Sequence, residues 1–132
     1  MNANHLKGQV NELKAQLWFA SQGYEIFIPL LTQTYYDMVV SKNNNLYSVQ
    51  VKTAHYITVK KQKYLQCRLG RTNSKKGARC YSYKDTADFL FVVYEDNYWL
   101  IPKEQLPLDK KTLYFNRGKK SGYDSTIWKV AH

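Results

Sequence analysis

Three strongly polar side chains stand in two otherwise apolar stretches of the sequence. Asp37 lies within Tyr35–Ser41, and Gln50 and Lys52 lie within Leu46–Ala54. Both stretches are rich in β-branched and aromatic residues, whereas aspartate and lysine are disfavoured in strands, so another group must compensate their charges. One compensation is an Asp37–Lys52 ion pair that only holds a sheet together, although such pairs contribute little net stability. The other is the binding of a divalent cation.

A Mg²⁺ ion would suit these residues, because it prefers oxygen ligands and typically takes one or two carboxylates, several waters and a substrate phosphate. Asp37 provides one carboxylate, and the Gln50 amide and the Val51 carbonyl add neutral oxygens. Glu12 would bring a second carboxylate if its helix packs beside the sheet. The Lys52 ammonium would polarise an attacking water and offset charge developing on a phosphate. The candidate catalytic residues are Glu12, Asp37, Gln50 and Lys52, and the candidate metal ligands are Glu12, Asp37, Gln50 and Val51.

A helix is expected to carry Glu12. Apolar residues recur at three- and four-residue spacing over residues 5–22, which predicts an amphipathic helix with Asn4 as its N-cap and Gly23 as its C-terminal stop. Such a helix turns its apolar stripe toward the core. The stripe consists of Leu6, Val10, Leu13, Leu17 and Ala20.

Three strands follow the helix. Period-two patterning predicts Tyr24–Pro29, Tyr35–Ser41 and Leu46–Ala54, and a turn centred on Asn43 and Asn44 joins the last two. This turn fixes a register. The expected pairs are Ser41 with Leu46, Val39 with Ser48, and Asp37 with Gln50.

The two faces of this hairpin differ in chemistry. Side chains alternate along a strand, so Gln50 and Lys52 share a face and Asp37 faces Gln50 across the pair. The opposite face is apolar and should lie against the helix or another core layer. It consists of Met38, Val40, Val49 and Val51.

A second, basic hairpin is predicted over Tyr56–Tyr83, with Gly70–Gly77 as an exposed tip. Its symmetry would place Cys67 near Cys80 and Arg68 near Arg79. Two short strands, a brief helical turn and a packed but irregular C-terminal segment complete the chain, over Phe89–Glu95, Tyr98–Ile101, Pro102–Gln105 and 109–132. The fold class expected is α/β, with a mixed sheet in a single domain of residues 1–132.

The charge balance indicates a polyanionic partner. The chain has 20 Lys and Arg against 10 Asp and Glu, a formal net charge of +10. Nucleic acid and an anionic membrane are the candidates, and the sequence lacks the long apolar run, basic amphipathic helix or lipidation signal that a membrane would require. Nucleic acid is therefore favoured.

The positive charge is concentrated in one segment. Between Met38 and Lys84 there are eleven Lys and Arg and no acidic residue. A two-stranded ribbon fits the DNA major groove, where Arg68, Arg71 and Arg79 are the better base readers because a guanidinium contacts guanine bidentately. The alternative is a solvated edge hairpin that its lysines protect from aggregation. The candidate DNA contacts are Lys60, Lys61, Lys63, Arg68, Arg71, Lys75, Lys76, Arg79 and Tyr81.

The N-terminal sequence MNANHLKGQ has no apolar h-region or secretory cleavage site, so a cytoplasmic, reducing location is expected. Cys67 and Cys80 have neither a CxxC partner nor a suitably spaced His pair, which argues against a zinc site. Both are expected to be ordinary thiols.

Taken together, Glu12, Asp37 and Gln50-Val51-Lys52 resemble the core of the PD-(D/E)XK nuclease superfamily, which includes restriction enzymes and Holliday junction resolvases. Lys7–Leu13 together with Tyr36-Asp37 is further similar to group I intron-encoded homing endonucleases of cyanobacterial transfer-RNA genes. The resemblance implies a restriction-endonuclease-like core, Mg²⁺-dependent cleavage of a long double-stranded DNA target, and a tetramer. One departure is Gln50, since the superfamily usually carries an acidic residue two positions before the lysine.

Three functions remain open from the sequence. The first is a site-specific endonuclease, in which one active site cuts one strand, so that a double-strand break requires at least two symmetric copies. The second is a nuclease that reads junction shape, as resolvases do. The third is a non-catalytic nucleic-acid-binding protein, which the charge and the aromatic residues alone would explain.

Overall fold

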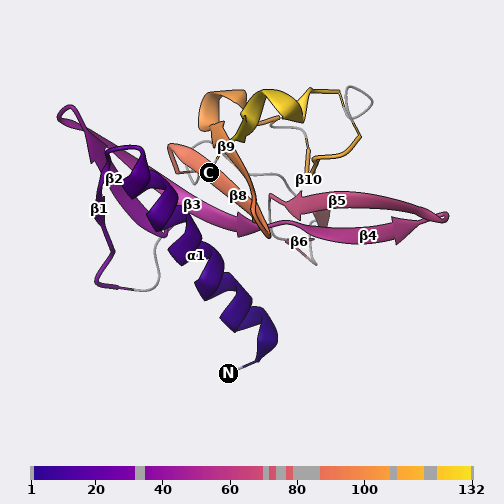
Figure 1. Cartoon of the computed structure of the whole chain (residues 1–132). Helices are drawn as coiled ribbons and strands as arrows, with labels where there is room; N and C mark the ends of the chain where they lie inside the picture. The colour runs from indigo at the N-terminus through magenta and orange to yellow at the C-terminus, as the bar shows by residue number, and fades with distance from the viewer. Residues whose placement is uncertain are drawn as a thin grey trace.

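The computed structural model of the chain describes residues 2–31, 35–69, 72–73, 77–78, 87–107, 110–117 and 122–131, with the backbone alone described at 72–73 and 77–78. One long helix lies against a sheet, and a hairpin projects from the far side (Figure 1). The elements are α1 (Ala3–Ser21), β1 (Glu25–Phe27), β2 (Met38–Lys42), β3 (Asn45–Thr53), β4 (His55–Val59), β5 (Gln62–Arg68), β6 (Thr72–Asn73), β7 (Gly77–Ala78), β8 (Phe89–Tyr94), β9 (Asn97–Pro102), η2 (Lys103–Gln105), β10 (Thr112–Tyr114), η4 (Ser125–Trp128) and β11 (Lys129–Val130).

The main sheet has six strands in the order β1-β2-β3-β8-β9-β11. Its strands pair antiparallel except for β3 and β8, which pair in parallel. Asp88 fastens this parallel pair, because its carboxylate accepts the Ser48 amide at 2.9 Å and its own amide donates to the Ser48 hydroxyl at 2.9 Å. The predicted α/β class with a mixed sheet and an N-terminal helix is confirmed.

Helix α1 begins two residues earlier than predicted. The side chain of Asn2 accepts the His5 amide at 2.9 Å, so Asn2 is the N-cap and the predicted cap Asn4 lies inside the helix. At the other end Gly23 has a φ of 90°, a left-handed conformation that glycine adopts easily. The Lys42 ammonium donates to the Gln22 carbonyl at 2.8 Å and satisfies this helix end.

The predicted apolar stripe of α1 is not its buried face. Leu6, Val10, Leu13 and Leu17 are exposed, whereas Ala15, Trp18 and Phe19 are buried, together with Asn11. The buried face of α1 is therefore the one that carries the two aromatic rings, each of which contributes a large apolar area to the core. Trp18 and Phe19 lie 5.4 Å and 5.5 Å from the Phe91 ring of β8. No helix in the described part of the chain has the length and apolarity needed to cross a membrane.

The β2–β3 hairpin has the predicted register. Ser41 pairs with Leu46 and Val39 with Ser48. The predicted pairing of Asp37 with Gln50 is not formed, because the ladder begins at Met38 and Asp37 bonds Val49 and Val51 instead. Asn43 and Asn44 have φ values of 52° and 66°, the left-handed pair that a tight hairpin turn requires and asparagine tolerates. The predicted apolar face also packs as expected, because Met38, Val40 and Val49 are fully buried, and Val51 partly so, in the core beneath α1.

The second hairpin differs from the prediction. It closes at Lys60–Lys61, where β4 and β5 pair antiparallel, and not at the glycine-bounded tip. A separate pair, β6 with β7, forms within that tip. Cys67 pairs with Leu113 of β10, and Arg68 pairs with Thr112. Cys80 and Arg79 lie outside the described residues.

The last third of the chain is more regular than predicted. The β8–β9 hairpin and the helical turn η2 are confirmed, but β10 adds to β5 and β11 adds to β9, where irregular structure was expected. The three-stranded sheet β10-β5-β4 and the C-terminal segment cover the face of the main sheet opposite α1. This second core contains Leu65, Cys67, Leu90, Val92, Trp99, Leu113 and Trp128.

Candidate active site

Asp37 is held beside strand β3 by two backbone contacts. Its amide donates to the Val49 carbonyl at 2.8 Å, and its carboxylate oxygen Oδ2 accepts the Val51 amide at 2.6 Å. Asp37 comes directly before β2, so its carboxylate occupies the edge of β3 that β2 does not cover. The amide and carbonyl of one strand residue point to the same neighbour. The Val51 carbonyl therefore points toward this edge as well.

Glu12 meets Asp37 from helix α1. Burial raises the pKa of the Glu12 carboxyl, and the charge of Asp37 and a hydrogen bond with it raise the pKa further. The neighbouring Asn11 anchors this part of the helix, because its Nδ2 donates to the Thr53 hydroxyl of β3 at 2.7 Å. The structure thus brings the two predicted carboxylates together. Two adjacent carboxylates repel each other, and a bound divalent cation would relieve that repulsion.

Gln50 and Lys52 lie on β3 on either side of Val51, but on the face away from α1. They pair in parallel with Leu90 and Val92 of the second core, whereas Val51 pairs with Phe91 beneath the helix. The pKa of Cys67 is raised to about 12 by burial, an effect that the Lys52 charge partly offsets, so Lys52 approaches this second core.

Helix α1 packs on the Val51 face of the sheet, in agreement with the predicted apolar face, so Glu12 does not lie over the face that carries Gln50 and Lys52. Glu12 and Asp37 meet at the sheet edge, while Gln50 and Lys52 approach the same stretch of β3 from the other side. Asp37 connects the two groups, since it is bonded to the residue between Gln50 and Lys52.

The donor set fits a hard cation that keeps part of its water shell. No cluster of three or more His, Cys, Asp or Glu side chains that would hold a metal ion exists among the described residues. Two carboxylates with the neutral oxygens of Gln50 and Val51 match Mg²⁺, which usually completes its coordination with waters and substrate phosphate.

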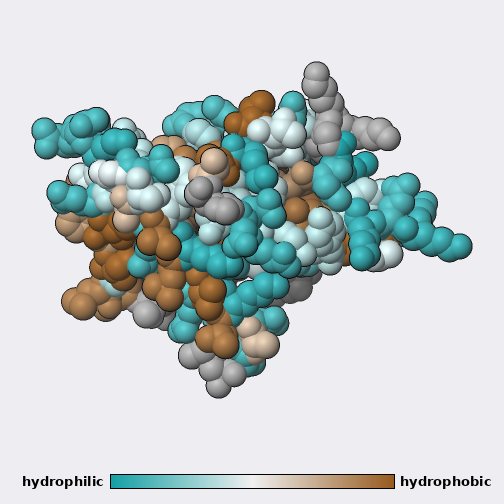
Figure 2. Space-filling model, in the orientation of Figure 1, coloured by the Kyte–Doolittle hydropathy of each residue, from teal (hydrophilic) through white to brown (hydrophobic). Residues whose placement is uncertain are grey.

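The described part of the predicted DNA surface is exposed. Lys60 and Lys61 form the turn between β4 and β5, at the end of the arm that projects from the main sheet (Figure 1). Lys63 and Arg68 of β5 are exposed as well. Hydrophilic side chains cover this arm in the space-filling view (Figure 2). The other predicted contacts, Arg71, Lys75, Lys76, Arg79 and Tyr81, lie outside the residues whose side chains are described.

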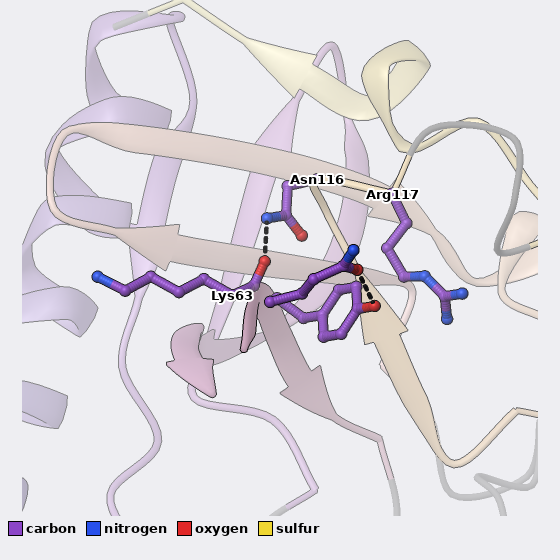
Figure 3. A pocket seen from close by; sticks show the side chains of 5 residues that line it. Lys63, Asn116 and Arg117 are labelled. Carbon is purple, nitrogen blue, oxygen red and sulfur yellow. Dashed lines mark hydrogen bonds between the residues drawn. The ribbon is translucent and has the colours of Figure 1, made fainter. Parts of the chain in front are cut away.

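Next to this arm lies an open cleft that sequence reasoning missed (Figure 3). Its volume is about 440 Å³, and two cations and no carboxylate line it. The Arg117 guanidinium lies 5.1 Å from the Tyr64 ring and 5.2 Å from the Tyr114 ring, the arrangement of a cation–π contact. The lining residues are Gln62, Lys63, Tyr64, Asn116 and Arg117.

Asn116 builds the cleft by joining distant segments. Its Nδ2 donates to the Lys63 carbonyl at 3.1 Å, and its Oδ1 accepts the Leu65 amide at 2.9 Å. Asn116 thereby mimics a further strand residue beside β5 after β10 has ended. No local pattern in the sequence predicts the contact of Asn116 with β5. The contact depends on the pairing of β10 with β5, and these strands are more than forty residues apart in the sequence.

Comparison with known proteins identifies relatives of this chain. A family model described as PD-(D/E)XK endonuclease matches residues 2–125. Protein 5.3 of Escherichia phage T7 is 36% identical over 98 residues, which is 74% of this chain and 78% of that protein. The solved structure of the bacterial homing endonuclease I-Ssp6803I has the same fold, with a TM-score of 0.72 and 20% identity over 96% of this chain and 91% of that one.

Proposed function

This chain belongs to the PD-(D/E)XK endonuclease family, and from that premise we propose that it is a site-specific, Mg²⁺-dependent endonuclease of double-stranded DNA that acts as a homing enzyme. The observation that carries the proposal is the meeting of Glu12 and Asp37 at the edge of β3. The negative charges of these two carboxylates repel each other at the strand edge. Such a pair indicates a cation site more than a structural contact.

The proposed roles follow from where each residue lies. Glu12 and Asp37 would hold Mg²⁺, with the Gln50 amide oxygen and the Val51 carbonyl as neutral donors; when bound, the ion supplies a Lewis acid for phosphodiester hydrolysis. The Val51 amide fixes the Asp37 carboxylate at 2.6 Å and so orients it. The Lys52 ammonium would orient the attacking water and offset negative charge that grows on the phosphate.

Binding of the substrate is assigned to the basic arm. Lys60, Lys61 and Lys63 would neutralise phosphates, and Arg68 would contact base edges. We add the Arg117 cleft to this surface, because a guanidinium supported by two tyrosine rings next to β5 presents charge and an aromatic face to the same ligand. The formal charge of +10 supports a polyanionic substrate.

A homo-oligomer is part of the proposal. Each chain contributes one candidate active site, so cutting both strands of a duplex at one place requires at least two copies related by symmetry. The resemblance to intron-encoded homing enzymes supports a tetramer and a long target, since four copies present more reading surface than one.

The direct test is to incubate the full chain with a genomic DNA library in Mg²⁺ and to sequence the ends produced. The proposal expects double-strand ends that recur within one extended sequence, and ends scattered without a common sequence would contradict it. Four-way junctions run in parallel decide between this function and a resolvase, which would cut junctions and spare linear duplexes. Binding to duplex, junction and RNA without cutting any of them would instead establish a non-catalytic binding protein.

A further inference from the structure

The outward face of α1 is apolar. Leu6, Val10, Leu13 and Leu17 are 55%, 41%, 61% and 72% exposed. At about 100° per residue these four lie on nearly the opposite side of the helix from the buried Ala15 and its neighbours. A surface helix normally shows polar residues on that side. The sequence thus has an aliphatic row that the fold of one chain leaves uncovered.

A second exposed apolar group begins at the last residue of β1, the strand beside which α1 packs, and continues beyond it. Phe27, Ile28, Leu30, Leu31 and Tyr35 are 49%, 57%, 97%, 74% and 67% exposed. In the space-filling view the hydrophobic colour gathers over the region that α1 and this segment occupy, away from the hydrophilic arm (Figures 1 and 2). We call the two groups together the apolar face.

The apolar face is large enough to be an interface. The nine side chains are 41–97% exposed. At roughly 100 Å² each they present about 900 Å² in all, against about 800 Å² per partner in a standard protein interface. The largest apolar patch on an ordinary monomer is smaller, roughly 300–600 Å². Water contact with this much apolar surface is unfavourable, and a matching surface would remove it.

The occupant that fits is a second copy of this chain. DNA presents a charged backbone and would not cover aliphatic side chains. All nine residues of the apolar face are uncharged, which matters because two chains of formal charge +10 repel each other wherever their cations meet. A two-fold axis through the face would set α1 against its own copy and match aliphatic row to aliphatic row.

We propose that this protein self-associates through the apolar face, with the α1 helices of two chains packed against each other on a two-fold axis. The inference rests on the proposed function only for its purpose, which is to present two active sites to one duplex. The buried side of α1 carries Glu12 toward Asp37. Dimerisation would therefore leave the active site and the basic arm of each chain open.

The test measures the mass of the full chain in solution by light scattering at micromolar concentration. The wild type is expected at two or more times 15.6 kDa, and a Leu13→Lys, Leu17→Lys variant at the mass of one chain with an unchanged far-UV circular dichroism spectrum. Both leucines are exposed, so the variant should fold. The matched control is Ile127→Lys, a residue 68% exposed on η4 outside the apolar face, which should keep the wild-type mass.

A monomeric wild type would overturn the inference, as would a double-lysine variant that keeps the wild-type mass. Failure of the endonuclease proposal is a separate result: an Asp37→Asn protein should keep the wild-type mass whatever its activity. If both ideas hold, the double-lysine variant should nick supercoiled plasmid carrying the target where the wild type linearises it. Equal linearisation by a monomeric variant would contradict the stated purpose of the dimer.

Discussion

At the scale of single residues, the candidate site depends on the Asp37 carboxylate, which a backbone hydrogen bond orients, and on the Glu12 carboxyl group beside it. The Val51 amide fixes Asp37, and α1 delivers Glu12 into a partly buried position where its charge is disfavoured. The residue types and the spacing of Glu12 and Asp37 already indicated a divalent-cation site. The contact itself could not be predicted, because it depends on which face of α1 is buried, and that face is set by Trp18 and Phe19.

Glu12→Gln is expected to stabilise the protein in the absence of divalent ions. The pKa of Glu12 is raised in the folded state above its ordinary value of 4.5. The folded state therefore binds the Glu12 proton more tightly than the unfolded state does. The free energy of unfolding falls as the pH rises from 4.5 through the raised pKa. At pH 7 the variant should melt a few degrees higher than the wild type, and below pH 4 the two should converge.

Thermal unfolding at pH 7 and pH 4 measures this difference, and added Mg²⁺ is the control. The ion should raise the melting temperature of the wild type more than that of Glu12→Gln, because the variant lacks one of the two carboxylates. A variant that melts lower than the wild type at pH 7 would show that the two carboxyl groups do not repel each other in the folded protein.

At the scale of elements, local turn chemistry decides what could be predicted. The β2–β3 register followed from Asn43 and Asn44, whose residue type tolerates positive φ. Lys60 and Lys61 adopt the same backbone conformation, with φ values of 52° and 67°, but lysine rarely signals such a turn. The glycines of Gly70–Gly77 therefore signal a turn more strongly than Lys60 and Lys61 do, so the sequence predicts the tip of the hairpin later in the chain than the turn that β4 and β5 form.

Replacing Lys60 by Asn and Lys61 by Gly together should raise the stability of the protein and lower its affinity for DNA. Asparagine and glycine suit the left-handed turn, so the free energy of unfolding in urea should rise by about 1 kcal/mol. Two phosphate contacts are lost, so affinity for duplex DNA should fall and its dependence on log salt should weaken by about 2. Lower stability would contradict the described turn, and unchanged affinity would remove it from the DNA surface.

Arg117→Ala tests the cleft beside the arm. Duplex affinity should fall several-fold, and the slope of log affinity against log salt should weaken by about 1 if Arg117 meets a phosphate. Lys129→Ala is a matched control, because Lys129 also lies over an aromatic ring, Trp99 at 5.5 Å, but on the edge strand β11. Equal losses in the two variants would show that overall charge, and not the cleft, determines binding.

At the scale of the whole molecule, long-range pairings separate what the sequence could predict from what it could not. The α/β class followed from a helix and alternating strands, and the charge segregation followed from composition. The parallel pairing of β3 with β8 and the addition of β10 to β5 join segments far apart in sequence, and no local residue pattern encodes them. Aliphatic periodicity predicts a buried row on α1 but does not reveal which surface the row covers, and the row is exposed.

In the proposed function, Asp37 and Lys52 carry out Mg²⁺-dependent cleavage while other residues bind the DNA. The most direct test of these roles is the cleavage rate of target DNA by Asp37→Asn and Lys52→Ala, measured together with duplex affinity. Asp96→Asn, which changes an exposed carboxylate in the β8–β9 turn, serves as the matched control. Both site variants are expected to lose about 100-fold or more in rate, with affinity within a few-fold of the wild type and full activity in the control. Cleavage by both site variants at the wild-type rate would contradict these roles.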